Sequence, residues 1–207
     1  MSKAIVLLSG GIDSAACLAW ASQRYDQIIA ISFQYHNRPF RERLAVLRLL
    51  RHFPARLIET PLPFLMEASD FNPEFADHVP EGYVSNRNLI FYSIAAHFSE
   101  LHGCESIVGG HTAEDQEAFS DAGATFLNRL ESLINQALLT RKVTIELPLS
   151  QWTKLDVLRK AAEWKVPFEC TWSCYWDVAG PCRKCISCKE RAEAFKALGL
   201  QDPLCMT

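Results

Sequence analysis

A chain of 207 residues with 49% hydrophobic and 22% charged side chains can bury a full core, so we expect a globular protein with one main domain and a small appendage. Its net charge of -3 excludes the broad basic surface typical of proteins that grip nucleic acid, so no nucleic-acid partner is expected. The N-terminal apolar run is too short for a secretory signal, and no run approaches the ~18 apolar residues of a membrane span. We therefore expect a cytoplasmic protein without a membrane partner.

The N-terminal stretch predicts a strand, a tight loop and a helix. An apolar run at 4–8 leads into Ser9-Gly10-Gly11-Ile12-Asp13-Ser14, and an alanine-rich run follows. Two glycines let the backbone approach a ligand closely, and the next helix presents unpaired N–H groups that attract an anion. The loop is not a Walker A motif, because no Gly-Lys-Ser/Thr follows the glycines. A plain glycine turn with a helix cap is the alternative, which the position after the first strand disfavours.

Further along the chain, strands and helices alternate. Hydrophobic spacing predicts, in order, a strand at 28–33, a helix at 40–53, a strand at 55–60, a helix at 87–102, a strand at 105–108, a helix at 124–139, a strand at 143–149 and a helix at 153–164. We interpret the long irregular segment 61–83 as a lid or substrate loop. Gly109-Gly110 follow the fourth strand and are expected beside the first glycine loop. The alternation predicts an α/β fold, a doubly wound and mostly parallel five-stranded sheet.

A cluster of cysteines marks the C-terminal part of the chain. Cys174, Cys182, Cys185 and Cys188 form a C-x7-C-x2-C-x2-C pattern that suits tetrahedral zinc. Four thiolates leave no open position, so a structural metal is expected, and an iron–sulfur cluster is the weaker alternative because no C-x3-C-P continues the run. We predict a main domain at 1–165 and a zinc-binding segment with a helix at 166–207. Cys170 is interpreted as inert or as a redox partner.

Taken together, these motifs resemble the 7-cyano-7-deazaguanine synthase (QueC-like) family of PP-loop ATP pyrophosphatases along nearly the whole chain. The shared features are Ser9 to Ser14, Arg87-Asn88 opening a helix, Gly109-Gly110 followed by Asp115, Pro148-Leu149 followed by Lys154, and the cysteine cluster. The resemblance implies an adenine nucleotide alpha hydrolase-like fold that converts a 7-carboxy-7-deazaguanine to an amide and then a nitrile. It further implies ATP, Mg²⁺ and Zn²⁺ as cofactors, ammonia as nitrogen donor, and a possible homodimer.

The resemblance also assigns roles to residues of this sequence. The implied catalytic residues are Asp13, Ser14 and Lys154. The implied nucleotide-binding residues are Ser9, Gly10, Gly11, Ile12, Asp13, Ser14, Gly109 and Gly110. The implied substrate-binding residues are Arg38, Arg87, Asn88, Asp115, Phe119 and Asp121. Of the histidines, His36 and His111 lie on the expected site loops, and neither is predicted to be catalytic.

Two substrate-facing stretches depart from the family pattern. Where the family has an aromatic-Pro-Asp-Cys-Arg segment, this chain has Phe119-Ser120-Asp121-Ala122-Gly123. Where the family has Gly-Gln-Arg-His, this chain has His36-Asn37-Arg38-Pro39. Substrate identity is therefore open, and a ligase that attaches a deazaguanine to another molecule is one alternative. A PP-loop tRNA thiolase is another, disfavoured by the acidic charge and by the lack of a basic extension. A non-enzymatic zinc-ribbon module on a nucleotide-binding scaffold is the third.

Overall fold

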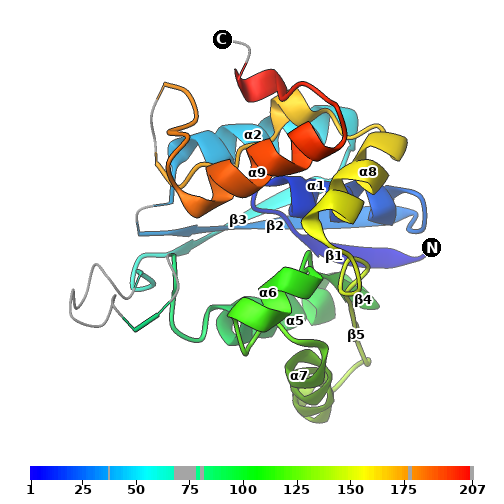
Figure 1. The fold of residues 1–207 in the computed structure, drawn as a ribbon. Helices are drawn as coiled ribbons and strands as arrows, with labels where there is room; N and C mark the ends of the chain where they lie inside the picture. Colours follow the sequence, from blue (N-terminus) through cyan, green and yellow to red (C-terminus); the bar gives the residue numbers. More distant parts are fainter. Residues whose placement is uncertain (37, 68–77, 80–81, 177–178, 206–207) are drawn as a thin grey trace.

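A parallel sheet forms the centre of the molecule (Figure 1). The structure is a computed structural model that describes residues 1–36, 38–67, 78–79, 82–176 and 179–205. Within these residues the sheet has five strands in the order β3-β2-β1-β4-β5, and every neighbouring pair is parallel. The strands are β1 (Lys3–Leu7), β2 (Gln27–Tyr35), β3 (Arg56–Leu62), β4 (Ser106–Val108) and β5 (Thr144–Glu146).

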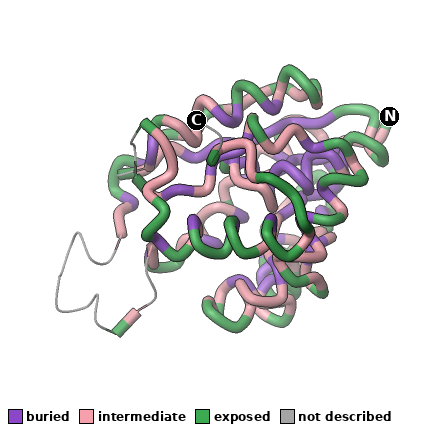
Figure 2. Tube along the Cα trace, turned by 45° about the horizontal axis from the view of Figure 1, so that its top comes forward, coloured by how far each residue is buried: buried purple, intermediate pink, exposed green. Residues whose placement is uncertain are grey.

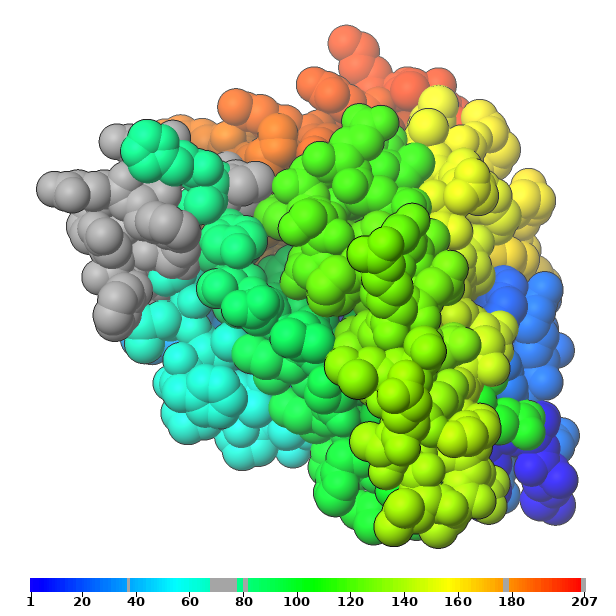
Figure 3. All heavy atoms as spheres, turned by 90° about the horizontal axis from the view of Figure 1, so that it is seen from below, coloured from blue at the N-terminus to red at the C-terminus, as the bar shows by residue number. Residues whose placement is uncertain are grey.

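Helices cover both faces of the sheet, so the predicted doubly wound fold is confirmed. One face carries α1 (Ile12–Ser22), α2 (Phe40–His52), α8 (Lys154–Glu163) and α9 (Ile186–Ala197). The other carries α5 (Arg87–His102), α6 (Ala113–Ala118) and α7 (Ala124–Ala137), which cover the underside of the molecule (Figure 3). Two short 3-10 helices, η1 (Phe168–Cys170) and η2 (Pro203–Cys205), lie in the C-terminal part. None of the described helices is long and apolar enough to cross a membrane.

The core lies on the two faces of the sheet, as the buried stretches of the chain show (Figure 2). In β1, Ala4, Ile5 and Val6 are fully buried, with Ala4 and Val6 packed on one face and Ile5 on the other. A central parallel strand covered on both sides has no solvent-facing side chains, which explains why this run reads as continuously apolar. The rigid central strands fix the loops at their carboxyl ends.

Local signals explain where the helices begin and end. Thr153 and Asp156 form the predicted capping box of α8, and Gly103 ends α5 with φ +70°. A second capping box, Thr112 with Asp115, starts α6, a helix that the sequence analysis did not predict. The predicted lid or substrate loop at 61–83 falls mostly outside the described residues, although β3 continues to Leu62.

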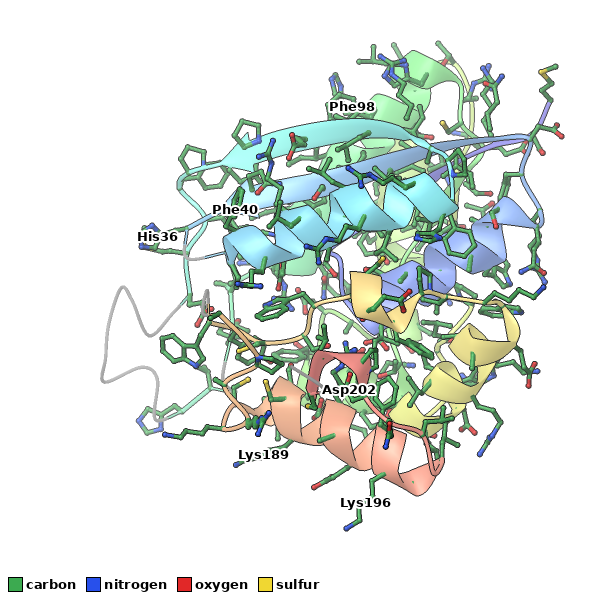
Figure 4. All side chains as sticks on the ribbon, turned by 90° about the horizontal axis from the view of Figure 1, so that it is seen from above. His36, Phe40, Phe98, Lys189, Lys196 and Asp202 are labelled. Atoms are coloured by element: carbon green, nitrogen blue, oxygen red, sulfur yellow. The ribbon has the colours of Figure 1, made fainter. Side chains whose placement is uncertain are left out.

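A buried ion pair holds the C-terminal part together. Arg191 on α9 donates to Asp202 through Nε at 2.8 Å and Nη2 at 2.9 Å, and its guanidinium also donates to Thr171 Oγ1 and the Phe168 carbonyl. The two side chains are only 4% and 7% exposed. Asp202 lies beside α9, whereas Lys189 and Lys196 point away from the rest of the molecule (Figure 4).

Replacing Asp202 by alanine is expected to lower the free energy of unfolding by about 3 kcal/mol, because it leaves the Arg191 guanidinium buried without its carboxylate. Urea denaturation measures the change. Glu163→Ala is the matched control, since it breaks the exposed Lys160–Glu163 pair and is expected to cost less than about 0.5 kcal/mol. Equal effects of the two variants would contradict the structural role of the buried pair.

Candidate active site

The first glycine loop connects β1 to α1. Gly10 has φ +101°, and a Cβ there would lie 2.6 Å from the Glu42 carbonyl oxygen, so only glycine fits. Gly11 is the N-cap of α1 and supplies no side-chain cap, so the first turn keeps its N–H groups for an anion. Ser14 Oγ accepts from the Ser9 and Gly10 amides at 3.2 Å each, which gives the loop its tight curve.

The second glycine loop lies beside the first, as predicted, because β1 and β4 are neighbours in the sheet. A Cβ on Gly110 would lie 3.1 Å from the Asp13 carbonyl carbon, so the two loops touch through backbone atoms. A Cβ on Gly109 would lie 1.7 Å from Tyr92 Oη, which is fully buried beneath the loop. The strand order reverses between β1 and β4, and such a switch point is where open α/β sheets bind ligands.

Gly109→Ala is expected to destabilise the protein by about 2–3 kcal/mol, because the added methyl cannot fit against the enclosed Tyr92 ring without moving the loop. Gly180→Ala is the matched control, since nothing lies within 4 Å of a Cβ at that position. Thermal melting and ATP titration of both variants check the expectation. An unchanged melting temperature for Gly109→Ala would show that the loop is not held as described.

A lysine from α8 joins the two loops. Lys154 Nζ lies 2.7 Å from Asp13 Oδ2 and 3.3 Å from Asp115 Oδ1, although Asp13 is 141 residues away in sequence. Burial would lower the pKa of Lys154, but the two carboxylates outweigh it and hold this pKa above its ordinary value. Burial raises the pKa of Asp13, and Lys154 partly offsets that rise. The cluster therefore places one fixed cation among carboxylates at the end of β1.

Arg38, in the connection between β2 and α2, supports the first loop. Its Nη2 donates to the Ser9 carbonyl at 2.6 Å, its Nη1 to Ser32 Oγ at 3.0 Å, and its Nε to Glu42 at 2.9 Å. The side chain is 3% exposed. Arg38 therefore supports the first loop, and its hydrogen-bond donors are already engaged by the protein.

Next to the two glycine loops, the predicted substrate residues on α5 and the following loops form a second wall of the site. The Arg87 guanidinium lies 5.9 Å from the centre of the Phe119 ring. Both carboxylate oxygens of Asp121 accept from Asn88, one from its backbone N–H at 3.1 Å and one from Nδ2 at 3.0 Å. Asp121 therefore orients Asn88 at the start of α5.

Two adjoining cavities collect most of the predicted residues. A cavity of about 330 Å³ is lined by Ser9, Gly11, Asp13, Ser14, Arg38, Arg87, Asn88, Gly109, Gly110, Asp115 and Phe119. A smaller one of about 180 Å³ is lined by Ser9, Gly11, Ile12, Asp13 and Lys154. Gly10 and Asp121 are not among the described residues that line either cavity.

The sequence analysis missed several lining residues from distant parts of the chain. Tyr175 and Ser187, from the C-terminal part, line both cavities, and Glu42 on α2 does so too. The Trp172 amide donates to the Gly10 carbonyl at 2.9 Å, which ties the C-terminal part to the first loop. Contacts over such separations leave no local pattern, although the Thr112-x-x-Asp115 capping box was a readable signal for α6.

The four predicted metal ligands converge. The sulfur atoms of Cys174, Cys182, Cys185 and Cys188 all lie within 4.8 Å of one another. A tetrahedral zinc with Zn–S bonds of about 2.3 Å holds its sulfurs about 3.8 Å apart, and the Cys182 and Cys188 sulfurs are 3.9 Å apart. Amides of Cys185 and Lys184 donate to the Cys182 sulfur and lower its pKa to about 6, whereas burial raises the pKa of the Cys174 and Cys188 thiols. The donor set fits one tetrahedral ion.

The parallel sheet, the switch-point cavity and the glycine loop without a Walker lysine define an α/β protein of the PP-loop class. Its fold is similar to that of the NMN synthetase from Francisella tularensis, with a TM-score of 0.55 and 13% identity over 97% of this chain and 78% of that one. At sequence level, the model of the family described as queuosine biosynthesis protein QueC matches residues 3–199. The chain belongs to the QueC family, and the resemblance expected from the motifs is confirmed.

Curated relatives match over nearly their full length. The 7-cyano-7-deazaguanine synthase of Persephonella marina is 34% identical, over 98% of this chain and 96% of that protein. The 7-cyano-7-deazaguanine synthase of Thermoplasma acidophilum is 35% identical, over 98% of this chain and 91% of that protein. This chain is therefore an ATP-dependent enzyme of queuosine biosynthesis.

Proposed function

We propose that the protein uses ATP to adenylate the carboxylate of a 7-carboxy-7-deazaguanine and transfers the acyl group to ammonia. The amide formed would be activated a second time and dehydrated to the nitrile, 7-cyano-7-deazaguanine. A carboxylate is a poor electrophile, and adenylation gives its oxygen a good leaving group. The names of the relatives support the product, and the chemistry of the site supports the activation.

The observation that carries the proposal is the Lys154 contact with Asp13 and Asp115 beside the first glycine loop. Negative charge develops on the α-phosphoryl oxygens and on the departing pyrophosphate, so fixed donors there stabilise the transition state. The amides at the start of α1 would bind pyrophosphate, and Lys154 would offset charge at the α-phosphoryl group. Mg²⁺ bound with ATP would supply further charge neutralisation.

The deazaguanine would lie against the second wall. Phe119 offers an aromatic surface, and Arg87 offers a cation that suits a carboxylate or an adenylate. We infer that Asn88 meets the heterocycle and that Asp121 acts by orienting Asn88, because both of its oxygens are already occupied. A homodimer remains a prediction.

We further propose that the cysteine group binds zinc. The sulfurs lie at the separation that one tetrahedral ion requires, whereas an iron–sulfur cluster is larger and holds its thiolates farther apart. A bound zinc would supply folding energy for the segment that contributes Tyr175 and Ser187 to the cavities.

Incubation with labelled ATP, Mg²⁺, ammonium and a panel of deazaguanines tests the reaction. We expect AMP and pyrophosphate, released with the 7-carboxy compound and with its amide but with no other deazaguanine, together with the amide and the nitrile as base products. A conjugate to another molecule would instead identify the attaching ligase. Stoichiometric ADP and phosphate would contradict the proposed activation.

A further inference from the structure

His111 is the residue that follows the two glycines of the second loop. Its ring lines the cavity of about 330 Å³, together with Arg87 and Asp115. Gly110, the preceding residue, contacts the backbone of Asp13, so His111 is held next to the first loop. Any group bound between the two glycine loops and Phe119 therefore lies close to this imidazole.

One ring nitrogen of His111, the buried Nε2, has no hydrogen-bond partner among the described residues. Tyr92 Oη, beneath the same loop, is likewise buried and unpartnered among these residues, and the two ring centres are 5.8 Å apart. Buried polar atoms nearly always have partners, so an unpartnered Nε2 on a residue that lines the cavity indicates that a ligand supplies its partner.

The surroundings keep the imidazole neutral. Burial lowers the pKa of His111 to about 4, with Arg87 and Lys154 acting in the same direction and Asp115 and Asp121 opposing them. A neutral imidazole has a lone pair that accepts a proton. The carboxylate of Asp115, four residues along the chain, would stabilise the imidazolium that results.

We propose that His111 accepts the proton that ammonia loses during nitrogen transfer, an inference that rests on the amidation proposed above. The ammonia nitrogen attacks the activated carbonyl carbon and forms the C–N bond. One proton passes from that nitrogen to the imidazole, and the C–O bond to AMP breaks with its electron pair leaving on AMP. The imidazolium then returns its proton to water. The attacking nitrogen, bonded to a tetrahedral carbon, gives up a proton more readily than free ammonium.

Separate assays of the two half-reactions test this role in His111→Ala and His111→Gln. Carboxylate-dependent exchange of labelled pyrophosphate into ATP, without ammonium, reports activation alone, and amide formation with ammonium reports the transfer. We expect both variants to keep exchange within about threefold of wild type. Amide formation should fall by about 100-fold or more, the usual contribution of a general base. His97→Ala, on the exposed side of α5, is the matched control and should change neither rate.

Glutamine keeps a hydrogen-bonding group but cannot take the proton, so the two variants should lose transfer equally. Parallel losses of exchange and transfer, an unchanged transfer rate, or a glutamine variant with wild-type transfer would overturn the assignment. Thermal melting of both variants shows whether the fold is kept. Absence of carboxylate-dependent exchange in the wild-type enzyme would instead refute the proposed activation, and this inference with it.

Discussion

Replacing Lys154 by methionine is expected to lower the rate of AMP formation by about 10²- to 10³-fold, the loss seen when one preorganised charge-stabilising donor is removed. Methionine keeps most of the side-chain volume but leaves Asp13 and Asp115 without the cation between them. Two carboxylates near ATP would then repel its phosphates. Affinity for ATP should therefore fall as well, and calorimetric titration measures it.

Lys160→Met is the matched control for this substitution. Lys160 lies on the same helix but pairs with Glu163 in solvent, where the two side chains are 42% and 51% exposed. The control should keep wild-type turnover within about twofold, because exposed pairs contribute little. A Lys154→Met enzyme with unchanged turnover would remove this lysine from the mechanism.

Replacing Cys185 by serine should lower both the zinc content and the melting temperature. Structural zinc contributes about 10–16 kcal/mol of apparent binding energy in small zinc domains, and a lost thiolate forfeits a large part of it. Cys185 is also 4% exposed and packs with Trp172, whose amide holds Gly10. ATP affinity should consequently fall together with stability.

Metal analysis and thermal melting, with and without a chelator, measure these changes. Cys205→Ser is the matched control, because Cys205 is exposed and lies outside the group of four sulfurs. One zinc per chain is expected in the wild-type protein and in this control. A brown protein with iron and sulfide would contradict the zinc proposal and would revive the thiolase alternative.

The sequence analysis was most successful for residues whose positions are set by the strands of the sheet. A β-branched run followed by glycines marks the end of a buried strand, and parallel strands bring such ends together, so the two glycine loops were predictable. Cysteine spacing is likewise local, and the four sulfurs converge as expected. These features could be predicted because they depend on residues that are neighbours in the sequence.

Other features depend on contacts that no local pattern records. Arg38 was expected to meet substrate; it lines the larger cavity, and it also donates to Glu42 and to the Ser9 carbonyl, contacts that only the packing of α2 and the loop before it reveals. Asp121 faces Asn88 across 33 residues. His111 was placed on an expected site loop, but no sequence pattern shows that its Nε2 is buried without a hydrogen-bond partner among the described residues.

The most direct test of adenylation follows the oxygen atoms of the substrate. A 7-carboxy-7-deazaguanine labelled with heavy oxygen in its carboxylate is turned over with ATP and ammonium, and the nucleotide and phosphate products are examined by mass spectrometry. If the carboxylate attacks the α-phosphorus, each AMP carries one labelled oxygen and the pyrophosphate carries none. Label found in inorganic phosphate, with ADP as the nucleotide product, would show attack at the γ-phosphorus and would contradict the proposed reaction.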